Sequence, residues 1–124
     1  MKYYTEDHLW VEISGEEVIV GISEYMADEI GDVEYVDLPG EDDDFIIGDR
    51  VGELRTSCER LVLYSPVSGT VSQSNEAVYD EPTLINDSPE EKGWLFHLRD
   101  FDSSELDDMM SEDAYLKYLA KNCR

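Results

Sequence analysis

The stretch Arg55-Thr56-Ser57-Cys58-Glu59-Arg60-Leu61-Val62-Leu63-Tyr64-Ser65-Pro66-Val67-Ser68-Gly69 decides the fold of this chain. It contains a β-type run, Leu61–Ser65, that ends at a proline and is followed by a serine–glycine turn. A second β-type run, Arg50–Leu54, precedes the stretch, and a third, Gly69–Gln73, follows it. The pattern predicts antiparallel strands joined by tight turns, with Cys58 in the first of these turns.

Short β-type runs and turn formers alternate through most of the remaining sequence. The other candidate strands are Trp10–Ile13, Glu17–Ile22, Val33–Leu38 and Trp94–Arg99. One short helix is expected among these strands, at Glu24–Ile30. A serine before it can cap its start, and a glycine after it can end it.

The C-terminal part of the chain reads as helical. Asp102 or Ser103 can cap a first turn, and a second helix is expected from Ser111 onward. Its apolar face is predicted from the spacing of Tyr115, Leu116 and Leu119. Since no linker separates this helix from the strands, we expect residues 1–124 to form a single, mostly β domain with flanking helices docked on it.

The chain is strongly acidic, with a net charge of −22 from 31 acidic and 9 basic residues. Such a surface repels nucleic acid and anionic lipid, and it favours partner proteins with basic docking surfaces. Solubility or adaptation to salt explains the same acidity equally well. The acidic stretches Glu41–Asp44, Asp80–Glu81 and Asp107–Asp108 are expected to be solvated loops or helix faces.

Several function classes have no support in the sequence. No apolar run is long enough to span a bilayer, and residues 1–7 lack a signal or transit pattern, so we expect a cytoplasmic protein. Two cysteines, Cys58 and Cys123, make neither a disulfide framework nor a metal site. The two histidines give no catalytic pattern: His8 reads as structural and His97 as lying on a solvent face.

A series of motifs along the chain carries a family resemblance. They are Tyr4-Thr5-Glu6-Asp7-His8-Leu9-Trp10-Val11, Val20-Gly21-Ile22-Ser23-Glu24-Tyr25, Pro66-Val67-Ser68-Gly69, Asn75-Glu76-Ala77, Leu84-Ile85-Asn86, Pro89 and Gly93-Trp94-Leu95. In order and spacing the sequence resembles the glycine cleavage system H proteins, which are lipoyl carriers. The resemblance implies a lipoyl/biotinyl-type flattened barrel (barrel-sandwich hybrid) of two antiparallel sheets, with one short internal helix and C-terminal helices.

The resemblance also implies a non-enzymatic function. In the family, a lysine at the hairpin tip carries lipoate through an amide bond. The arm visits the glycine decarboxylase, the aminomethyltransferase and the dihydrolipoyl dehydrogenase, and between visits it lies in a surface cleft. A lipoate-handling enzyme is a further expected partner, and we expect the protein itself to be a monomer.

Four positions depart from the family pattern at the places that serve the arm. Cys58 stands at the position of the lipoyl-lysine, and no lysine occurs between residues 48 and 69. Arg55 replaces a glutamate through which the ligase recognises the hairpin. Leu9 and Val62 replace acidic residues that line the cleft. The sequence therefore predicts no lipoate on this chain at the usual hairpin.

Three functions remain open at this point. The favoured one is a scaffold that binds a glycine-cleavage partner or a lipoate-handling enzyme without carrying the arm. The second is a working H component with an unconventional attachment. The third is a thiol carrier or redox role of Cys58, whose pKa Arg55 and Arg60 could lower. Cys58 itself has three interpretations: neutral drift at a turn that has lost its task, a functional thiol, or a mutation introduced into an ordinary H protein. We prefer neutral drift to a functional thiol.

Overall fold

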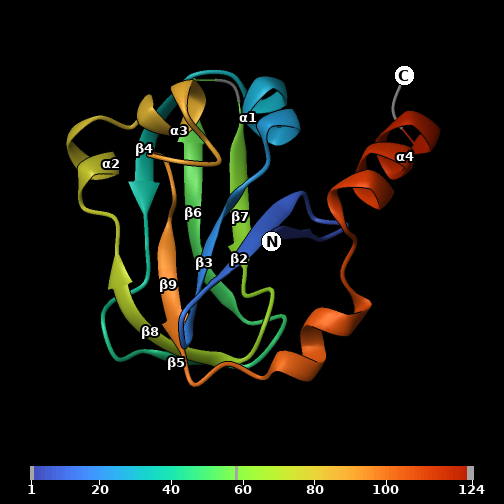
Figure 1. The fold of residues 1–124 in the computed structure, drawn as a ribbon. Helices are drawn as coiled ribbons and strands as arrows, with labels where there is room; N and C mark the ends of the chain where they lie inside the picture. The colour runs from blue at the N-terminus through green and yellow to red at the C-terminus, as the bar shows by residue number, and fades with distance from the viewer. Residues whose placement is uncertain (1, 58, 123–124) are drawn as a thin grey trace.

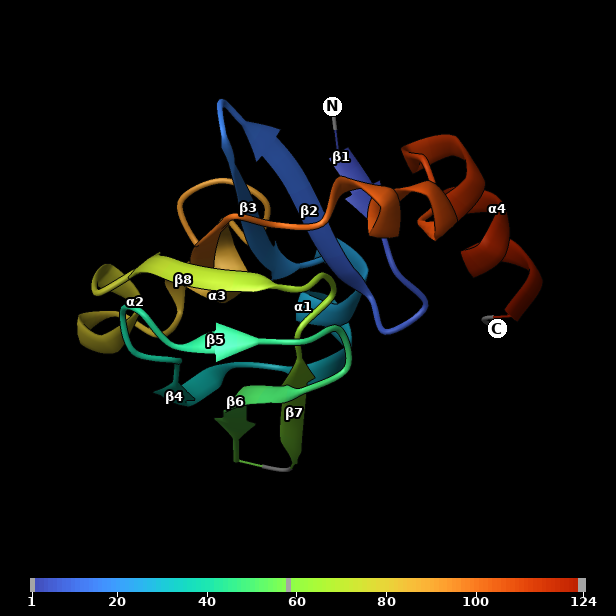
Figure 2. The same ribbon diagram turned by 90° about the horizontal axis from the view of Figure 1, so that it is seen from below.

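The computed structural model describes residues 2–57 and 59–122. The chain forms two antiparallel sheets that face each other (Figures 1 and 2). The larger sheet has six strands in the order β1-β2-β3-β9-β8-β5. These strands are β1 (Lys2–Tyr4), β2 (Leu9–Ser14), β3 (Glu17–Ile22), β5 (Asp44–Phe45), β8 (Gly69–Ser74) and β9 (Phe96–Arg99).

The smaller sheet has three strands in the order β4-β6-β7, and it carries the hairpin singled out in the sequence. Its strands are β4 (Val33–Asp37), β6 (Arg50–Thr56) and β7 (Arg60–Tyr64). All strand pairs in both sheets are antiparallel. In the described residues the two sheets do not join into a closed barrel, which agrees with the expected flattened, sandwich-like architecture.

Two sequence signals set the ends of helix α1 (Glu24–Ile30). The Ser23 hydroxyl accepts a hydrogen bond from the backbone N–H of Met26, which satisfies one free donor of the first turn. Gly31 ends the helix with φ +79°, a conformation that favours glycine. Both predicted ends of this helix are therefore confirmed.

The remaining helices lie around the sheets. Helices α2 (Ala77–Asp80) and α3 (Leu84–Asp87) are single turns, and α3 lies with α1 at one end of the sheets (Figure 1). The 3-10 helix η1 (Ser103–Asp108) is capped by Asp102, whose carboxylate accepts from the N–H of Ser104. Helix α4 (Glu112–Asn122) follows at the side of β1 and β2. No helix in the described part of the chain is long and apolar enough to cross a membrane.

The main core lies between the two sheets. Side chains from both sheets are fully buried in it, including Val11, Val20, Leu54 and Leu98. Burying such a side chain contributes about 1.5–3 kcal/mol relative to leaving it in water. Because the core is shared, each sheet supplies the apolar surface that the other needs.

A second cluster fastens α4 to the larger sheet. Tyr115 is 3% exposed, and its ring stacks on Tyr4 with centroids 4.5 Å apart. Tyr118 and Leu119 pack against the same cluster, whereas Leu116 is 56% exposed. The predicted apolar face was therefore wrong at Leu116, because the helix turns its Tyr115, Tyr118 and Leu119 stripe inward.

Two asparagines from the sequence motifs hold loops in place. The Asn86 amide oxygen accepts from the N–H of Val33, and its nitrogen donates to the carbonyl of Gly31 at the end of α1. The Asn75 amide nitrogen donates to the carbonyls of Lys92 and Trp94. These motif residues are therefore structural, since they satisfy backbone groups that no strand pairs.

Candidate functional site

The β6–β7 hairpin has a defined register up to its turn. Arg55 lies opposite Arg60, and the N–H of Thr56 donates to the carbonyl of Glu59 over 2.9 Å. The Glu59 N–H in turn donates to the Thr56 hydroxyl over 3.0 Å. Cys58, the residue at the position of the family's lipoyl-lysine, lies outside the described residues. Its role stays a prediction from the sequence.

A buried carboxylate lies on the outer face of this hairpin, with three arginines around it. The side chain of Glu53 is only 4% exposed. Its Oε1 accepts from Arg50 over 2.7 Å and lies 3.6 Å from Nε of Arg60. Its Oε2 accepts a short hydrogen bond from Nε of Arg55. Three guanidinium groups thus converge on one carboxylate.

Opposing effects set the pKa of Glu53. Burial favours the neutral acid, but the hydrogen bond from Arg55 and the charges of Arg55, Arg60 and Arg50 favour the carboxylate. The arginines prevail, and the pKa of Glu53 lies below its ordinary value. The carboxylate therefore stays ionised at neutral pH and pairs with the three arginines.

The sequence indicates Arg55 and Arg60 as residues that could lower the pKa of the Cys58 thiol, and this stays a prediction. The structure places both guanidinium groups at the carboxylate of Glu53. Arg55 also lies 5.1 Å above the ring of Tyr35, in a cation–π contact. The Glu53 cluster was missed because its arginines come from both strands, so they meet only once the register is known.

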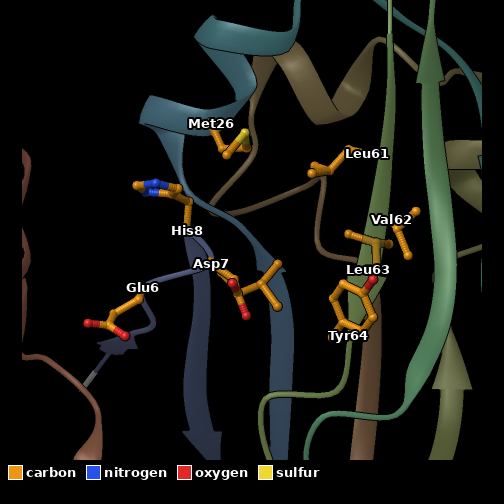
Figure 3. Close-up of a pocket in the computed structure, with 9 residues that line it drawn as sticks. Glu6, Asp7, His8, Met26, Leu61, Val62, Leu63 and Tyr64 are labelled. Atoms are coloured by element: carbon orange, nitrogen blue, oxygen red, sulfur yellow. The ribbon is translucent and has the colours of Figure 1, made fainter. Parts of the chain in front are cut away.

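An apolar cavity opens beside β7. It has a volume of about 280 Å³ and lies between β7, α1 and the loop that joins β1 to β2 (Figure 3). Leu61, Val62, Leu63 and Tyr64 come from β7 and Met26 comes from α1. The loop contributes Glu6, Asp7 and His8, and Leu9 follows at the start of β2. Leu9 and Val62 thus line this cavity.

His8 forms part of the cavity wall and joins it to α4. Its Nδ1 lies 2.8 Å from the hydroxyl of Tyr115, which lies 2.7 Å from the hydroxyl of Ser23. Burial lowers the pKa of His8, although the nearby charges of Asp7 and Glu29 oppose the effect. His8 is therefore neutral at pH 7, and its place in this network agrees with a structural role.

A second, larger cavity continues from the first along the same side of the molecule. It has a volume of about 650 Å³ and shares Glu6, Asp7 and Tyr64 with the smaller one. Its other lining residues come from four segments: Tyr4 and Thr5, Ile47 and Gly48, Ser65 and Pro66, and Glu105, Asp108, Met109 and Met110. We call the two cavities together the β7 groove. Among the described residues, its lining contains neither lysine nor arginine.

His97 has a different setting from the one predicted. It lies on the face of β9 opposite the buried Phe96 and Leu98, as expected. Its side chain is nevertheless only 15% exposed, because the ring of Trp94 covers it with centroids 4.6 Å apart. Its Nδ1 lies 3.0 Å from Glu17, and this hydrogen bond is the main reason that the pKa of Glu17 is lowered.

The described residues contain no cluster of side chains that could bind a metal ion. Within residues 2–57 and 59–122, no three histidine, cysteine, aspartate or glutamate side chains lie together as metal ligands would. The two described histidines bond to Tyr115 and Glu17 instead.

Two facing antiparallel sheets with a tight hairpin in the smaller one define the lipoyl-type barrel-sandwich class of protein. The sequence model of the family described as "Glycine cleavage H-protein" matches residues 2–122. The chain therefore belongs to the glycine cleavage H-protein family.

Individual relatives agree with this assignment. The glycine cleavage system H protein of Staphylococcus haemolyticus is 40% identical over 118 residues, which are 95% of this chain and 94% of that protein. A probable glycine cleavage system H protein of Haloarcula marismortui is 40% identical, covering 90% of this chain and 88% of that one. The crystal structure of an H protein from Mycobacterium marinum superposes with a TM-score of 0.83 at 26% identity, covering 98% of this chain and 95% of that one.

Proposed function

We propose that this protein is an H-protein scaffold that carries no lipoyl group at the usual hairpin and acts by binding partner proteins. The observation that carries the proposal is the identity of residue 58. A lipoyl amide needs an amine, and cysteine offers a thiol. The only lysines in the chain are Lys2, Lys92, Lys117 and Lys121, so none stands elsewhere in the hairpin to replace it.

The division between kept and altered motif residues supports the proposal. Gly31, Asn75 and Asn86 match the family motifs, and Ser23 stands where those motifs have threonine, which is also a helix-capping residue. Ser23 caps α1, Gly31 ends it, and the two asparagines fasten loops. The altered positions are Cys58, Arg55, Leu9 and Val62, which belong to the hairpin and the cavity beside it. The fold uses the first set of residues, whereas in the family only the arm uses the second set.

The chemistry of the cavity also favours an arm-free protein. A carboxylate in an apolar wall is costly unless a cationic ligand pairs with it. Leu9 is buried and Val62 half-buried, so apolar groups fill both positions. The described part of the hairpin also fits lipoate poorly, since Thr56, Ser57 and Glu59 offer no amine for its attachment.

We further propose a cytoplasmic location and partners among the proteins that handle H proteins or lipoate. These are the glycine decarboxylase, the aminomethyltransferase, the dihydrolipoyl dehydrogenase or a lipoate-handling enzyme. The net charge of −22 favours basic docking surfaces on whichever of these binds.

The intact mass of the protein purified from its own host tests the proposal. We expect the unmodified mass, with and without a reducing agent. A lipoyl-sized increment would instead show a working carrier with an unconventional attachment. An increment lost on reduction would move the function to a cysteine thiol, and slow, equal alkylation of Cys58 and Cys123 would argue against that alternative.

A further inference from the structure

The outer edge of β7 is open along the groove. Among the described strands β7 pairs only with β6, so its other edge has no partner strand. The bond from Thr56 to Glu59 marks these two as a hydrogen-bonded pair of the hairpin. By the alternation of an antiparallel ladder, Arg60 and Val62 then direct their backbone N–H and C=O groups away from β6.

The groove along this edge is apolar at its base. Leu9, Leu61, Leu63 and Met26 line the smaller cavity, and Met109 and Met110 line the larger one. At its margin Tyr64 is 43% and Ile47 is 48% exposed. Methionine side chains adapt to differently shaped partners, and exposed apolar groups at an open strand edge mark a surface that another chain can cover.

The walls of the groove are acidic. Glu6, Asp7 and Asp108 are exposed, and the groove lining that the structure describes offers their carboxylates no lysine or arginine. A fourth carboxylate, that of Glu105, is already hydrogen-bonded within the protein. It accepts from the N–H and the hydroxyl of Ser68 over 2.6 and 3.0 Å. The groove thus combines an apolar base with unneutralised negative charge at its rim.

We propose that the β7 groove binds an extended, basic segment of a partner protein, which adds as a strand to the open edge of β7. Side chains on one face of that strand enter the apolar cavity, and lysine or arginine side chains on the other face meet Glu6, Asp7 and Asp108. Strand addition gives affinity through main-chain hydrogen bonds and selects the partner through alternate side chains.

Charge complementarity distinguishes this occupant from a second copy of the chain. A copy that offered its own β7 edge would bring another net charge of −22 to the groove, and the two would repel each other. A basic segment is attracted by the same field. The inference rests on the proposed function in one respect, namely that the protein acts by binding a partner.

A synthetic octapeptide that alternates valine and arginine, labelled with fluorescein, tests the proposal by fluorescence anisotropy. Its controls are two versions of the same peptide, methylated on alternate backbone nitrogens in one register or the other, which keep the charge; only the version methylated on the edge that faces β7 loses strand pairing. We expect that version to bind about ten-fold more weakly, as the loss of one or two hydrogen bonds implies, and the other version to bind like the parent peptide. Equal affinities would overturn the proposal, because they would show attraction to the acidic surface alone.

Variants of the protein locate the binding. Asp7→Asn is expected to weaken binding a few-fold, whereas Asp80→Asn, which removes an exposed charge on α2 outside the groove, is expected to leave it unchanged. Amide NMR signals of Arg60–Tyr64 should shift most on titration with the peptide. Shifts spread over the acidic surface without a maximum on β7, or equal effects of both variants, would overturn the proposal.

The outcomes separate this inference from the proposed function. The peptide experiment uses the full chain without any modification, and the mass experiment uses the native protein. Peptide binding together with a lipoyl-sized mass increment would reject the arm-free function but support strand addition at the β7 groove. An unmodified native mass without selective peptide binding would support the arm-free function but reject strand addition at the β7 groove.

Discussion

The hydroxyl of Tyr115 in α4 lies 2.8 Å from Nδ1 of His8, in the wall of the smaller cavity. The same hydroxyl lies 2.7 Å from Ser23, which caps α1. One phenol therefore joins the C-terminal helix, the wall of the groove and the start of α1. The geometry of the groove and the docking of α4 are properties of one hydrogen-bonded network.

This network makes stability depend on the protonation of His8. The pKa of His8 in the folded protein is lowered, so the unfolded chain binds the proton more readily. Stability should be complete above pH 6.5 and fall as the pH drops below it. The variant His8→Asn removes the titration, keeps an acceptor near Tyr115 and suits the φ of +67° at this position.

Thermal unfolding between about pH 5 and 8 measures the effect. The wild-type melting temperature should fall relative to that of His8→Asn as the pH is lowered through this window. The two proteins differ only at residue 8, so the difference between their melting curves reports on His8. Parallel curves for the two proteins would contradict the assignment.

Removing the Tyr115 hydroxyl should loosen α4. In Tyr115→Phe the ring still stacks on Tyr4, but His8 and Ser23 lose a buried partner. We expect a loss of about 1–3 kcal/mol in the free energy of unfolding, measured with urea. Leu116→Ser, on the exposed side of the same helix, is the matched control and should change stability by less than about 0.5 kcal/mol. Equal losses of stability in the two variants would contradict the packing of α4 through Tyr115.

The Glu53 cluster should stabilise the hairpin through its carboxylate. Glu53→Gln leaves three guanidinium groups close together without their anion, whereas Arg60→Gln removes only the most distant of the three. We therefore expect a clearly lower urea midpoint for Glu53→Gln than for Arg60→Gln. The lowered pKa of Glu53 gives the pH dependence: its contribution is complete above pH 4.5 and is lost as the pH falls through the folded-state value. A midpoint lower in Arg60→Gln would contradict this account.

Gly52 allows β6 to approach β4. A Cβ at this position would collide with the backbone oxygen of Asp37, which cannot move without separating the two strands. Gly52→Ala should lose more than about 3 kcal/mol of stability, at the high end for overpacking. Gly15→Ala is the control, because its Cβ would meet open space and only its φ of +63° is unfavourable, at a cost of about 1 kcal/mol. Similar losses in both variants would argue against the close approach.

Local signals in the sequence predicted much of the fold. Helix α1 was placed correctly because Ser23 and Gly31 act on their own neighbours along the chain. Strands β1 and β5 were missed, since they have only three and two residues and their partners lie elsewhere in the sequence. The single turns α2 and α3 were also missed, because four residues carry no helical period.

The candidate site shows the same division. The resemblance at Leu9 and Val62 assigned both residues to one cleft, and both line the smaller cavity. The buried carboxylate of Glu53 could not be predicted in this way. Its three arginines are drawn from two strands, and nothing along the chain distinguishes it from the other 30 acidic residues of the 31.

The pairing of residues 4 and 110 affects how the protein is made. The N–H of Tyr4 donates to the carbonyl of Met110, and the N–H of Met110 donates back, over 2.7 and 2.8 Å. Both residues line the larger cavity. During synthesis on the ribosome, the first strand must therefore wait for residue 110 to leave the exit tunnel before the groove can close. Until then Met109 and Met110 are missing from the groove, and the apolar side chains of its other segments stay exposed on the nascent chain.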